Sequence, residues 1–420
     1  MDPMSNEHLK ELELLSDREV EKISDWIIET RRRIHANPEL AFEEKATAEL
    51  VVSALQEAGW EVRSNVAGYG AIGVMHSQSN YGRNVTKEYC LAFRADMDAL
   101  PITEDTGAAY ASRNPGKMHA CGHDNHVAIA LGMARVLSKL RGQWDGTVKL
   151  IFEPAEETGG GAELMIQGGA LEHPKVDSII TLAVGTSICE GQFRFIEGPA
   201  MPRIDNFEIH VEGEASHGGE PHRGIDAIVL AAEIVIALQR VVSRQVSVAD
   251  PVILNVYKIS GGHPDGIIPD HVTLYCTLRS YTDSVRVRTF GLIRQAAKGI
   301  AASYGGQAQV AISKEAACIV GYHDPAITRL VAEIATNIVG KDNVVYETKP
   351  DWGGDSFASY ARDIPGTFVW LGVRNEAEGR IYPVHHPKFD VNDQILPSAV
   401  KVGCRAAFRL LSRELFPEPQ

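Results

Sequence analysis

Residues 118–126 read MHACGHDNH and bring one thiol, three imidazoles and a carboxylate within nine positions of the chain. They stand at the head of an apolar run, 127–140, which predicts a helix. Cys121 and His123 are one residue apart, so both side chains can reach one ion from a turn that leads into a helix. Thiolate and imidazole favour zinc, manganese, iron or cobalt over calcium or magnesium. Taken alone, the stretch also fits a buried thiol beside polar residues that cap a helix.

The composition excludes several classes of protein. With 420 residues, 44% of them hydrophobic, the chain is long enough for two or three domains. Its net charge of −14 argues against nucleic acid or an anionic membrane as a partner. Because no apolar run approaches membrane-spanning length and the acidic N-terminus lacks a signal-peptide pattern, we expect a cytoplasmic protein. The scattered cysteines fit no disulfide framework, and we expect free thiols at Cys90, Cys189, Cys276, Cys318 and Cys404.

Hydrophobic periodicity predicts an α/β fold with a separate insert. Strands and helices alternate early in the chain, which favours a mainly parallel sheet flanked by helices. Helices are predicted at 17–36, 46–58, 127–140, 162–167, 326–339 and 397–416, and strands at 60–66, 70–75, 89–94, 147–152 and 368–373. Near Arg203 the pattern changes to a β-α-β-β-α unit, with strands at 207–211, 252–259 and 271–279 and helices at 225–242 and 283–303. We therefore predict a discontinuous metal-binding catalytic domain, 1–203 and 317–420, and an inserted α+β domain, 204–316.

Carboxylates follow two of the predicted strands. Asp96 comes after the first of them, and Glu156 and Glu157 follow the second. Open α/β sheets place their sites at the carboxyl ends of strands. Adjacent residues on an irregular turn point in different directions, so one glutamate can bind a metal while its neighbour takes a proton from a water that the metal acidifies. A solvated acidic pair is the alternative for this stretch alone.

Two further stretches are ambiguous by themselves. His385 and His386 lie in an irregular segment after the last predicted strand, where His385 is either a further metal ligand or part of a surface pair. The basic run Arg31–His35 closes the first predicted helix and is either a solvated helix end or an anchor.

Six stretches together carry a resemblance to a known family: RRRIHANPELAFEE (31–44), RADMDALP (94–101), MHACGHDNH (118–126), FEPAEETGGGAELMIQGG (152–169), ASHGGEPHRGID (215–226) and VHHPKFDV (384–391). The chain resembles the co-catalytic metallopeptidases and amidohydrolases, which include aminoacylases, glutamate carboxypeptidases and auxin-conjugate hydrolases. It looks most similar to the auxin-conjugate branch. The stretches occur in order over most of the chain, so together they are specific. The resemblance implies that the insert is a lid that also forms a dimer.

The resemblance also implies a set of metal ligands. Cys121 would bridge two metal sites. Glu157 and His385 would complete one site, and His123 would belong to the other.

Three more residues receive roles from the resemblance. Glu156 would be the general base. His217, in the insert, would reach the active site of a partner subunit and bind substrate or stabilise charge. Asp96 would contact a metal ligand and orient it, without binding the metal itself.

The chain departs from the family pattern at three places. Where the family has Leu-His-Val, whose histidine binds the second metal, residues 182–184 read Leu-Ala-Val, and Ala183 cannot bind a metal. The second site then keeps fewer than the three protein ligands usual for catalytic zinc. The usual Asn-Val-Ile-Pro reads Gly-Ile-Ile-Pro at 266–269, without the amide that helps to bind the substrate's backbone end. The usual Gly-Ser-Glu-Asp-Phe reads Gly-Gly-Asp-Ser-Phe at 353–357.

These residues predict a metal-dependent hydrolase of carbon–nitrogen bonds, with one firm site per subunit for manganese, zinc, cobalt or iron, in a homodimer or higher homo-oligomer. Amide hydrolysis needs a polarised carbonyl and a stabilised oxyanion, which the loss of a metal weakens most. An electron-poor aromatic amine carries its own electron sink and would tolerate the loss of a metal. The family has an outlying member that acts on such a substrate, 5-nitroanthranilate aminohydrolase, and the chain is similar to it. We expect a small aromatic amine with a carboxylate as the substrate and ammonia as a product.

Two alternatives remain. One is an N-acyl-amino-acid or auxin-conjugate amidohydrolase, or a carboxypeptidase, that works with one metal. The other is an inactive binder of a small carboxylate, which the intact Glu156 argues against because a binder needs no base.

Overall fold

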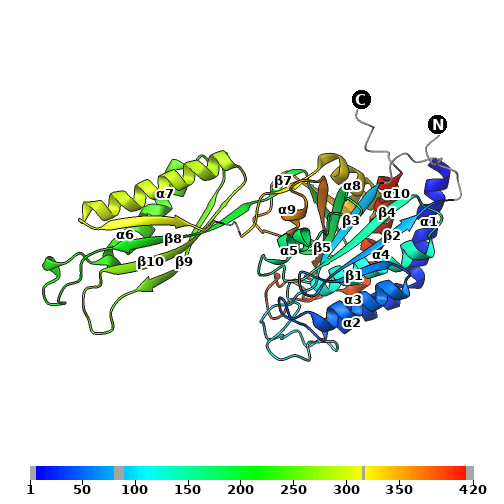
Figure 1. Ribbon diagram of the computed structural model, residues 1–420, viewed down its shortest axis with the longest axis horizontal. Helices are drawn as coiled ribbons and strands as arrows, with labels where there is room; N and C mark the ends of the chain where they lie inside the picture. Colours follow the sequence, from blue (N-terminus) through cyan, green and yellow to red (C-terminus); the bar gives the residue numbers. More distant parts are fainter. Residues whose placement is uncertain (1–5, 80–88, 315–316, 413–420) are drawn as a thin grey trace. The chain divides into compact units, whose positions relative to one another are not determined.

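The computed structural model describes residues 6–79, 89–314 and 317–412. The chain forms two compact units (Figure 1). The first comprises Met1–Gly198, Tyr322–Lys349 and Ser359–Gln420, and the second comprises Pro199–Gly321 and Pro350–Ala358. The segment Pro350–Ala358 groups with the second unit although it lies beyond the predicted insert in the sequence. Among the described residues, no helix is both long enough and apolar enough to cross a membrane.

The first unit is built on a sheet that has eight strands within the described residues. Their order is β1 (Glu61–Val66), β2 (Gly70–Ser77), β4 (Gly146–Glu153), β3 (Cys90–Asp96), β5 (Ser178–Cys189), β14 (Gly366–Arg374), β6 (Phe193–Ile196) and β13 (Val344–Glu347). The central strands β4, β3, β5 and β14 are parallel, and antiparallel pairs join β1 to β2, β2 to β4 and β6 to β14. The prediction of a mainly parallel sheet flanked by helices is confirmed. Strands β5, β6 and β13 were not predicted.

The helices that pack against this sheet (Figure 1) are α3 (Lys45–Glu57), α4 (His123–Lys139), α5 (Gly161–Gln167), α8 (Pro325–Val339) and α10 (Leu396–Leu411). Helices α1 (Asn6–Lys22) and α2 (Ser24–His35) pack on α4 and α10. The short helix α9 (Phe357–Tyr360) spans the boundary between the two units. The single helix predicted at 17–36 is wrong, because the chain breaks at Ile23, where the Ser24 hydroxyl donates to the carbonyl of Val20. The predicted closing helix ends at Leu411, and its residues 413–416 lie outside the described residues.

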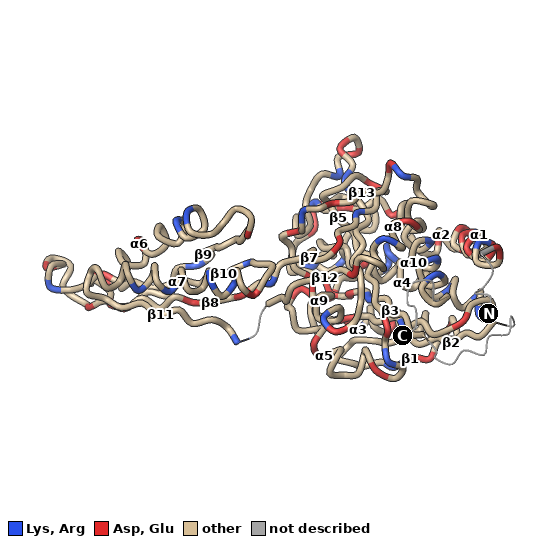
Figure 2. The backbone as a smooth tube through the Cα atoms, turned by 90° about the horizontal axis from the view of Figure 1, so that it is seen from above, with Lys and Arg blue, Asp and Glu red and all other residues tan. Residues whose placement is uncertain are grey.

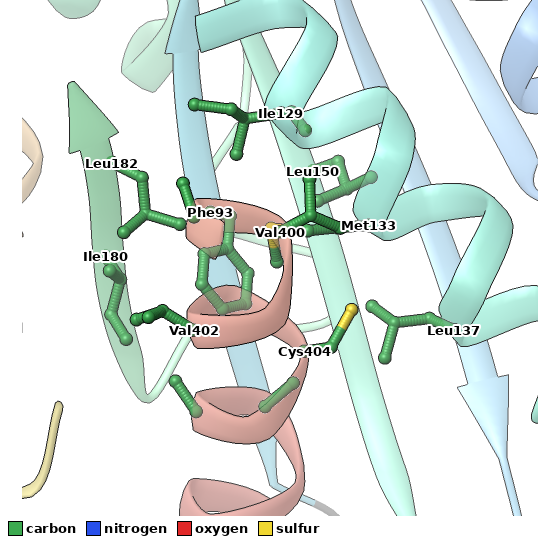
Figure 3. Close-up of a cluster of buried hydrophobic side chains, with 14 of the residues drawn as sticks. Phe93, Ile129, Met133, Leu137, Leu150, Ile180, Leu182, Val400, Val402 and Cys404 are labelled. Atoms are coloured by element: carbon green, nitrogen blue, oxygen red, sulfur yellow. The ribbon is translucent and has the colours of Figure 1, made fainter. Parts of the chain in front are cut away.

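The packing of α4 fixes the position of its N-terminus. Side chains of Ile129 and Met133 in α4 converge with Phe93 of β3 and Val400 of α10 (Figure 3). Burying each such side chain contributes about 1.5–3 kcal/mol. Gly403 lets the two helices approach, since a Cβ atom there would lie 2.4 Å from the sulfur of Met133. Because α4 begins at His123, this core holds the histidine-rich stretch against the sheet.

The second unit contains a four-stranded antiparallel sheet in the order β11 (Gln307–Ile312), β8 (Arg203–Glu212), β10 (His271–Ser280) and β9 (Ile253–Gly261). Helices α6 (Ala227–Arg240) and α7 (Asp283–Ser303) pack against it around a separate core that includes Ile209, Leu274 and Phe290. The predicted β-α-β-β-α unit therefore gains a further strand, β11. Strands β7 (Gly198–Met201) and β12 (Gly321–His323) pair in a small separate sheet. Charges of both signs are interspersed along both units (Figure 2).

Candidate metal centre

The candidate centre lies at the carboxyl ends of β3 and β4, beside the N-terminus of α4. Asp96 ends β3, and the Ala155–Glu157 turn follows β4. Gly122, the residue before α4, has a φ of 88°, and a Cβ atom there would lie 2.3 Å from Cγ2 of Val184. Only glycine meets both conditions without strain. The local backbone thus places Cys121 and His123 on either side of a tight turn that faces the ends of the strands.

The four predicted ligands come together in the first unit. Ligand atoms of Cys121, His123 and Glu157 all lie within 4.8 Å of one another. His385 Nε2 lies 3.4 Å from Glu157 Oε1, and the His385 backbone amide donates to the carbonyl of Ala120 at 2.8 Å. The stretch around His385 is therefore tied directly to the loop that carries the thiol.

The donor set fits a transition-metal ion. Glu157 Oε1 is buried and has no hydrogen-bond partner among the described residues, although His385 Nε2 lies 3.4 Å and His123 Nε2 3.8 Å away. Buried polar atoms normally have a hydrogen-bond partner or bind a metal. A cation bound by this oxygen and the two imidazoles would provide the missing partner. A thiolate, two imidazoles and a carboxylate form a set that zinc, manganese, iron and cobalt all accept.

The local electrostatics favour a cation. Burial lowers the pKa of His123, but Asp96 and Cys121 outweigh it and raise that pKa well above its usual value. The carboxylate of Glu157, whose Oε1 lies 3.4 Å from Nε2 of His385, raises the pKa of His385. The raised pKa values of His123 and His385 indicate a negative electrostatic potential at the centre. Such a potential attracts a metal ion as it attracts a proton. Burial raises the pKa of the Cys121 thiol, so metal binding must displace the thiol proton and depends on pH.

Asp96 and His126 hold strand β5 beside the centre. Asp96 Oδ1 lies 2.6 Å from His126 Nδ1, and His126 Nε2 accepts the backbone N–H of Val184 at 2.9 Å. Since Nε2 accepts, Nδ1 carries the proton and donates to Asp96. Ligand atoms of Asp96, His123 and His126 also lie within 4.8 Å of one another, but both nitrogens of His126 are already used. This trio is therefore a poor second metal site.

The role predicted for Asp96 is shared by a neighbour that sequence reasoning missed. Asp98 Oδ1 accepts the amide of Glu156 and Oδ2 accepts the amide of Glu157, each at 3.0 Å. Asp98 Oδ1 also lies 3.3 Å from His123 Nδ1, whereas Asp96 Oδ2 lies 3.7 Å from His123 Nε2. Burial acts to raise the pKa of Asp96, but Arg94, followed by the two histidines, holds it well below its usual range. Both carboxylates face the centre, as their shared place after β3 permits.

The basic run at the end of α2 is an anchor at three of its residues, Arg31, Arg32 and His35. Arg32 donates to Asp393 through Nε at 2.7 Å and through Nη2 at 3.1 Å. Arg31 is fully buried, with Nε 2.7 Å from Asp124 Oδ2, and His35 Nδ1 lies 2.8 Å from the same oxygen. Arg31 heads the charges that hold the pKa of Asp124 far below its usual range against the effect of burial. Because Asp124 directly follows His123, this network fixes the first turn of α4. Arg33 is exposed, as the solvated alternative requires.

His217 belongs to the second unit, and its part in the site stays a prediction. It is exposed, and its Nδ1 accepts the amide of Gly219 at 3.0 Å. The proton of the neutral ring therefore lies on Nε2, which can act as a donor.

Comparison with known proteins decides the family. The model of peptidase family M20/M25/M40 matches residues 92–409. The chain belongs to this family. It is 36% identical over 380 residues to thermostable carboxypeptidase 2 of Saccharolobus solfataricus, covering 90% of this chain and 93% of that protein. It is 33% identical over 389 residues to IAA-amino acid hydrolase ILR1-like 4 of Arabidopsis thaliana, covering 92% of this chain and 86% of that one.

A solved structure extends the comparison. The YXEP protein of Bacillus subtilis, a dinuclear metal-binding peptidase of family M20, has a TM-score of 0.79 and 30% identity and covers 93% of this chain and 99% of its own. This chain is thus a metal-dependent hydrolase that acts on carbon–nitrogen bonds, as predicted from its motifs. It carries the buried Ala183 in β5, paired with Trp370 of β14.

Proposed function

We propose that this M20 enzyme works with one firmly bound transition-metal ion per subunit, held by Cys121, Glu157 and His385 with His123 as a fourth ligand. The observation that carries the proposal is the buried Glu157 Oε1, which accepts no hydrogen bond from the described residues and lies 3.8 Å from His123 Nε2 and 3.4 Å from His385 Nε2. Alanine at position 183 is the second observation. The occupied ring of His126 supplies no replacement ligand.

Two observations support Glu156 as the general base of the proposed reaction. Its amide is held by Asp98, one residue from the proposed ligand Glu157, and its side chain is half-buried. A bound ion supplies a Lewis acid that polarises the substrate and acidifies a water molecule. The Glu156 carboxylate takes the proton of that water and returns it to the leaving nitrogen. His217, through the proton on Nε2, binds the negative charge of the substrate.

We propose an electron-poor aromatic amine with a carboxylate, such as 5-nitroanthranilate, as the substrate. With one metal, the site has less capacity to polarise an amide carbonyl and to hold its oxyanion. In a nitroaromatic amine the ring and the nitro group take the charge. The oxygen of water bonds to the ring carbon, the carbon–nitrogen bond breaks, and ammonia leaves with the proton from Glu156.

Hydrolysis of N-acyl amino acids or auxin conjugates is the second candidate. The similarity to the Arabidopsis IAA-amino acid hydrolase favours it. It requires that one ion and the polar groups of the pocket suffice to stabilise an oxyanion.

A substrate panel separates the candidates. The enzyme is loaded with Mn²⁺ or Zn²⁺ and given 5-nitroanthranilate, N-acetyl and indole-3-acetyl amino acids and dipeptides, while ammonia, free amino acid and arylamine are measured. We expect ammonia from the nitroaromatic amine. Release of amino acids alone supports the second candidate, and inactivity over the panel supports a binder. Glu156→Gln protein is the matched control for contaminating activity.

We propose that His217 acts across a homodimer, and subunit mixing tests this. Glu156→Gln and His217→Ala subunits are each expected to be inactive. After subunit exchange, one site in each mixed dimer is intact, so an equimolar mixture should regain about a quarter of wild-type activity. Absence of rescue, when mass spectrometry demonstrates mixed dimers, contradicts the trans role.

A further inference from the structure

The turn that carries Glu156 and Glu157 begins with a strained residue. Ala155 has a φ of 56°, in the left-handed region that residues other than glycine rarely adopt. Such a conformation persists only where its surroundings hold it, and it often occurs at functional sites. Ala155 directly precedes the proposed base, so whatever holds its backbone also aims the next two side chains.

A buried carboxyl group from a distant part of the chain holds this residue. Glu44 Oε1 accepts the amide of Ala155 at 2.8 Å, across 111 positions in sequence. The same oxygen accepts the amide of Phe42 at 3.0 Å, and Phe42 also has a positive φ, 61°. Glu44 has no exposed surface. One oxygen atom therefore joins two strained backbone segments.

The two hydrogen bonds that Glu44 Oε1 accepts, from Phe42 and Ala155, form a clamp on the turn, and neighbouring contacts extend it. Asp98 accepts the amides of Glu156 and Glu157, so two carboxyl groups receive the hydrogen bonds of three consecutive amides. The ring of Phe42 lies beside Gly160, where a Cβ atom would be 3.5 Å from Cζ of the ring. The turn is thus fixed at its start by Glu44 and further along by Asp98.

We infer that Glu44 is a positioning residue for the reaction, acting through Ala155 to orient the base Glu156 and the ligand Glu157. The inference rests on the proposed roles of those two glutamates. It assigns a task to a buried acid whose Oε1 accepts the backbone amides of Phe42 and Ala155.

The clamp needs a hydrogen-bond acceptor rather than a negative charge. Burial raises the pKa of Glu44 to about 7, and the charge of Asp98 adds to this effect, while backbone amides oppose it. Oε2 has no hydrogen-bond partner among the described residues, so it can hold the proton while Oε1 continues to accept. Glutamine keeps an oxygen acceptor at this position, whereas methionine, of similar length, has only a weakly accepting sulfur.

Two variants separate positioning from bulk packing. In Glu44→Met, hydrogen exchange of the Ala155 amide should be at least about tenfold faster, because its acceptor is gone. kcat should fall by about 10- to 100-fold, the size of effect expected when a reacting group is misplaced by about 1 Å. Mn²⁺ affinity, measured by calorimetry, should also fall because Glu157 lies on the released turn. Glu44→Gln should stay within about threefold of wild type in exchange, kcat and affinity, since it retains the acceptor.

A second variant, Ala155→Gly, distinguishes loss of the clamp from simple unfolding. Glycine adopts a positive φ without strain, so Ala155→Gly should reduce the need for the clamp. Glu44→Met should therefore lower kcat less in the Ala155→Gly protein than in the wild-type protein. The inference is overturned if hydrogen exchange of the Ala155 amide is unchanged in Glu44→Met. It is also overturned if Glu44→Gln and Glu44→Met lower kcat and Mn²⁺ affinity equally. Hydrogen exchange is read without substrate, so it still tests the clamp if Glu156→Gln proves fully active and the proposed base is wrong.

Discussion

Replacing Glu156 by glutamine should lower kcat by about two to four powers of ten, the usual range for general-base catalysis, while the metal is retained. The amide side chain keeps the shape of glutamate but cannot take a proton from water. Asp98 holds the Glu156 amide, a backbone contact that the substitution leaves in place. Steady-state kinetics on the substrate that the panel identifies, with metal analysis of the same sample, measure both quantities.

Glu157→Gln is the matched control for this prediction. It changes the neighbouring residue on the same turn in the same way, but it should lower metal content as well as turnover, because Glu157 Oε1 is the proposed ligand atom. If Glu156→Gln retains near-wild-type turnover, or loses its metal as Glu157→Gln does, the assignment of the base is wrong.

Replacing Cys121 by serine should remove metal and activity together. The thiol lies within 4.8 Å of the ligand atoms of His123 and Glu157, and a neutral hydroxyl is a much weaker ligand for a transition metal than a thiolate. Loss of a supporting contact alone costs 10- to 100-fold in metal sites, so loss of a ligand should weaken Mn²⁺ or Zn²⁺ binding by about 100-fold or more. Equilibrium dialysis measures the binding.

The exposed Cys189 provides the control, since Cys189→Ser changes the same kind of side chain in the same unit. It should leave metal content and turnover unchanged. A Cys121→Ser protein that binds metal as tightly as wild type would show that the thiol is not a ligand.

Residues close in sequence were the predictable part of the site. Cys121 and His123 share one motif, and Glu156 and Glu157 are adjacent, so local spacing sufficed to group them. His385 was assigned by the family resemblance, and the structure places it 3.4 Å from Glu157.

The contacts of Glu44 and Asp98 were not predictable, because they join distant segments through backbone groups. Glu44 received no role from the sequence, and only the fold brings it to the amide of Ala155. Asp98 also received no role from the sequence, and the structure places its two oxygens against the amides of Glu156 and Glu157. The hydrogen bonds of Glu44 and Asp98 do not affect hydrophobic periodicity, because this pattern indicates burial rather than hydrogen bonding.

The missed elements of the fold have a similar explanation. Strand β5 is buried along most of its length between β3 and β14, so it lacks the alternation by which a strand is recognised, as is usual for central parallel strands. The break at Ile23 depends on a hydroxyl–carbonyl contact within an otherwise amphipathic run. Strand β11 lies at the edge of its sheet and has a weak apolar pattern.

The metal content of the purified enzyme after mild dialysis tests the central claim most directly. Wild type should hold about one ion per subunit, because Ala183 supplies no ligand and His126 is fully hydrogen-bonded. Ala183→His, with folding checked by circular dichroism, should raise the content toward about two, since it restores the imidazole that the family pattern has at this position. Two tightly held ions per wild-type subunit would contradict the one-metal account and remove the reason for preferring an activated aromatic amine over an amide.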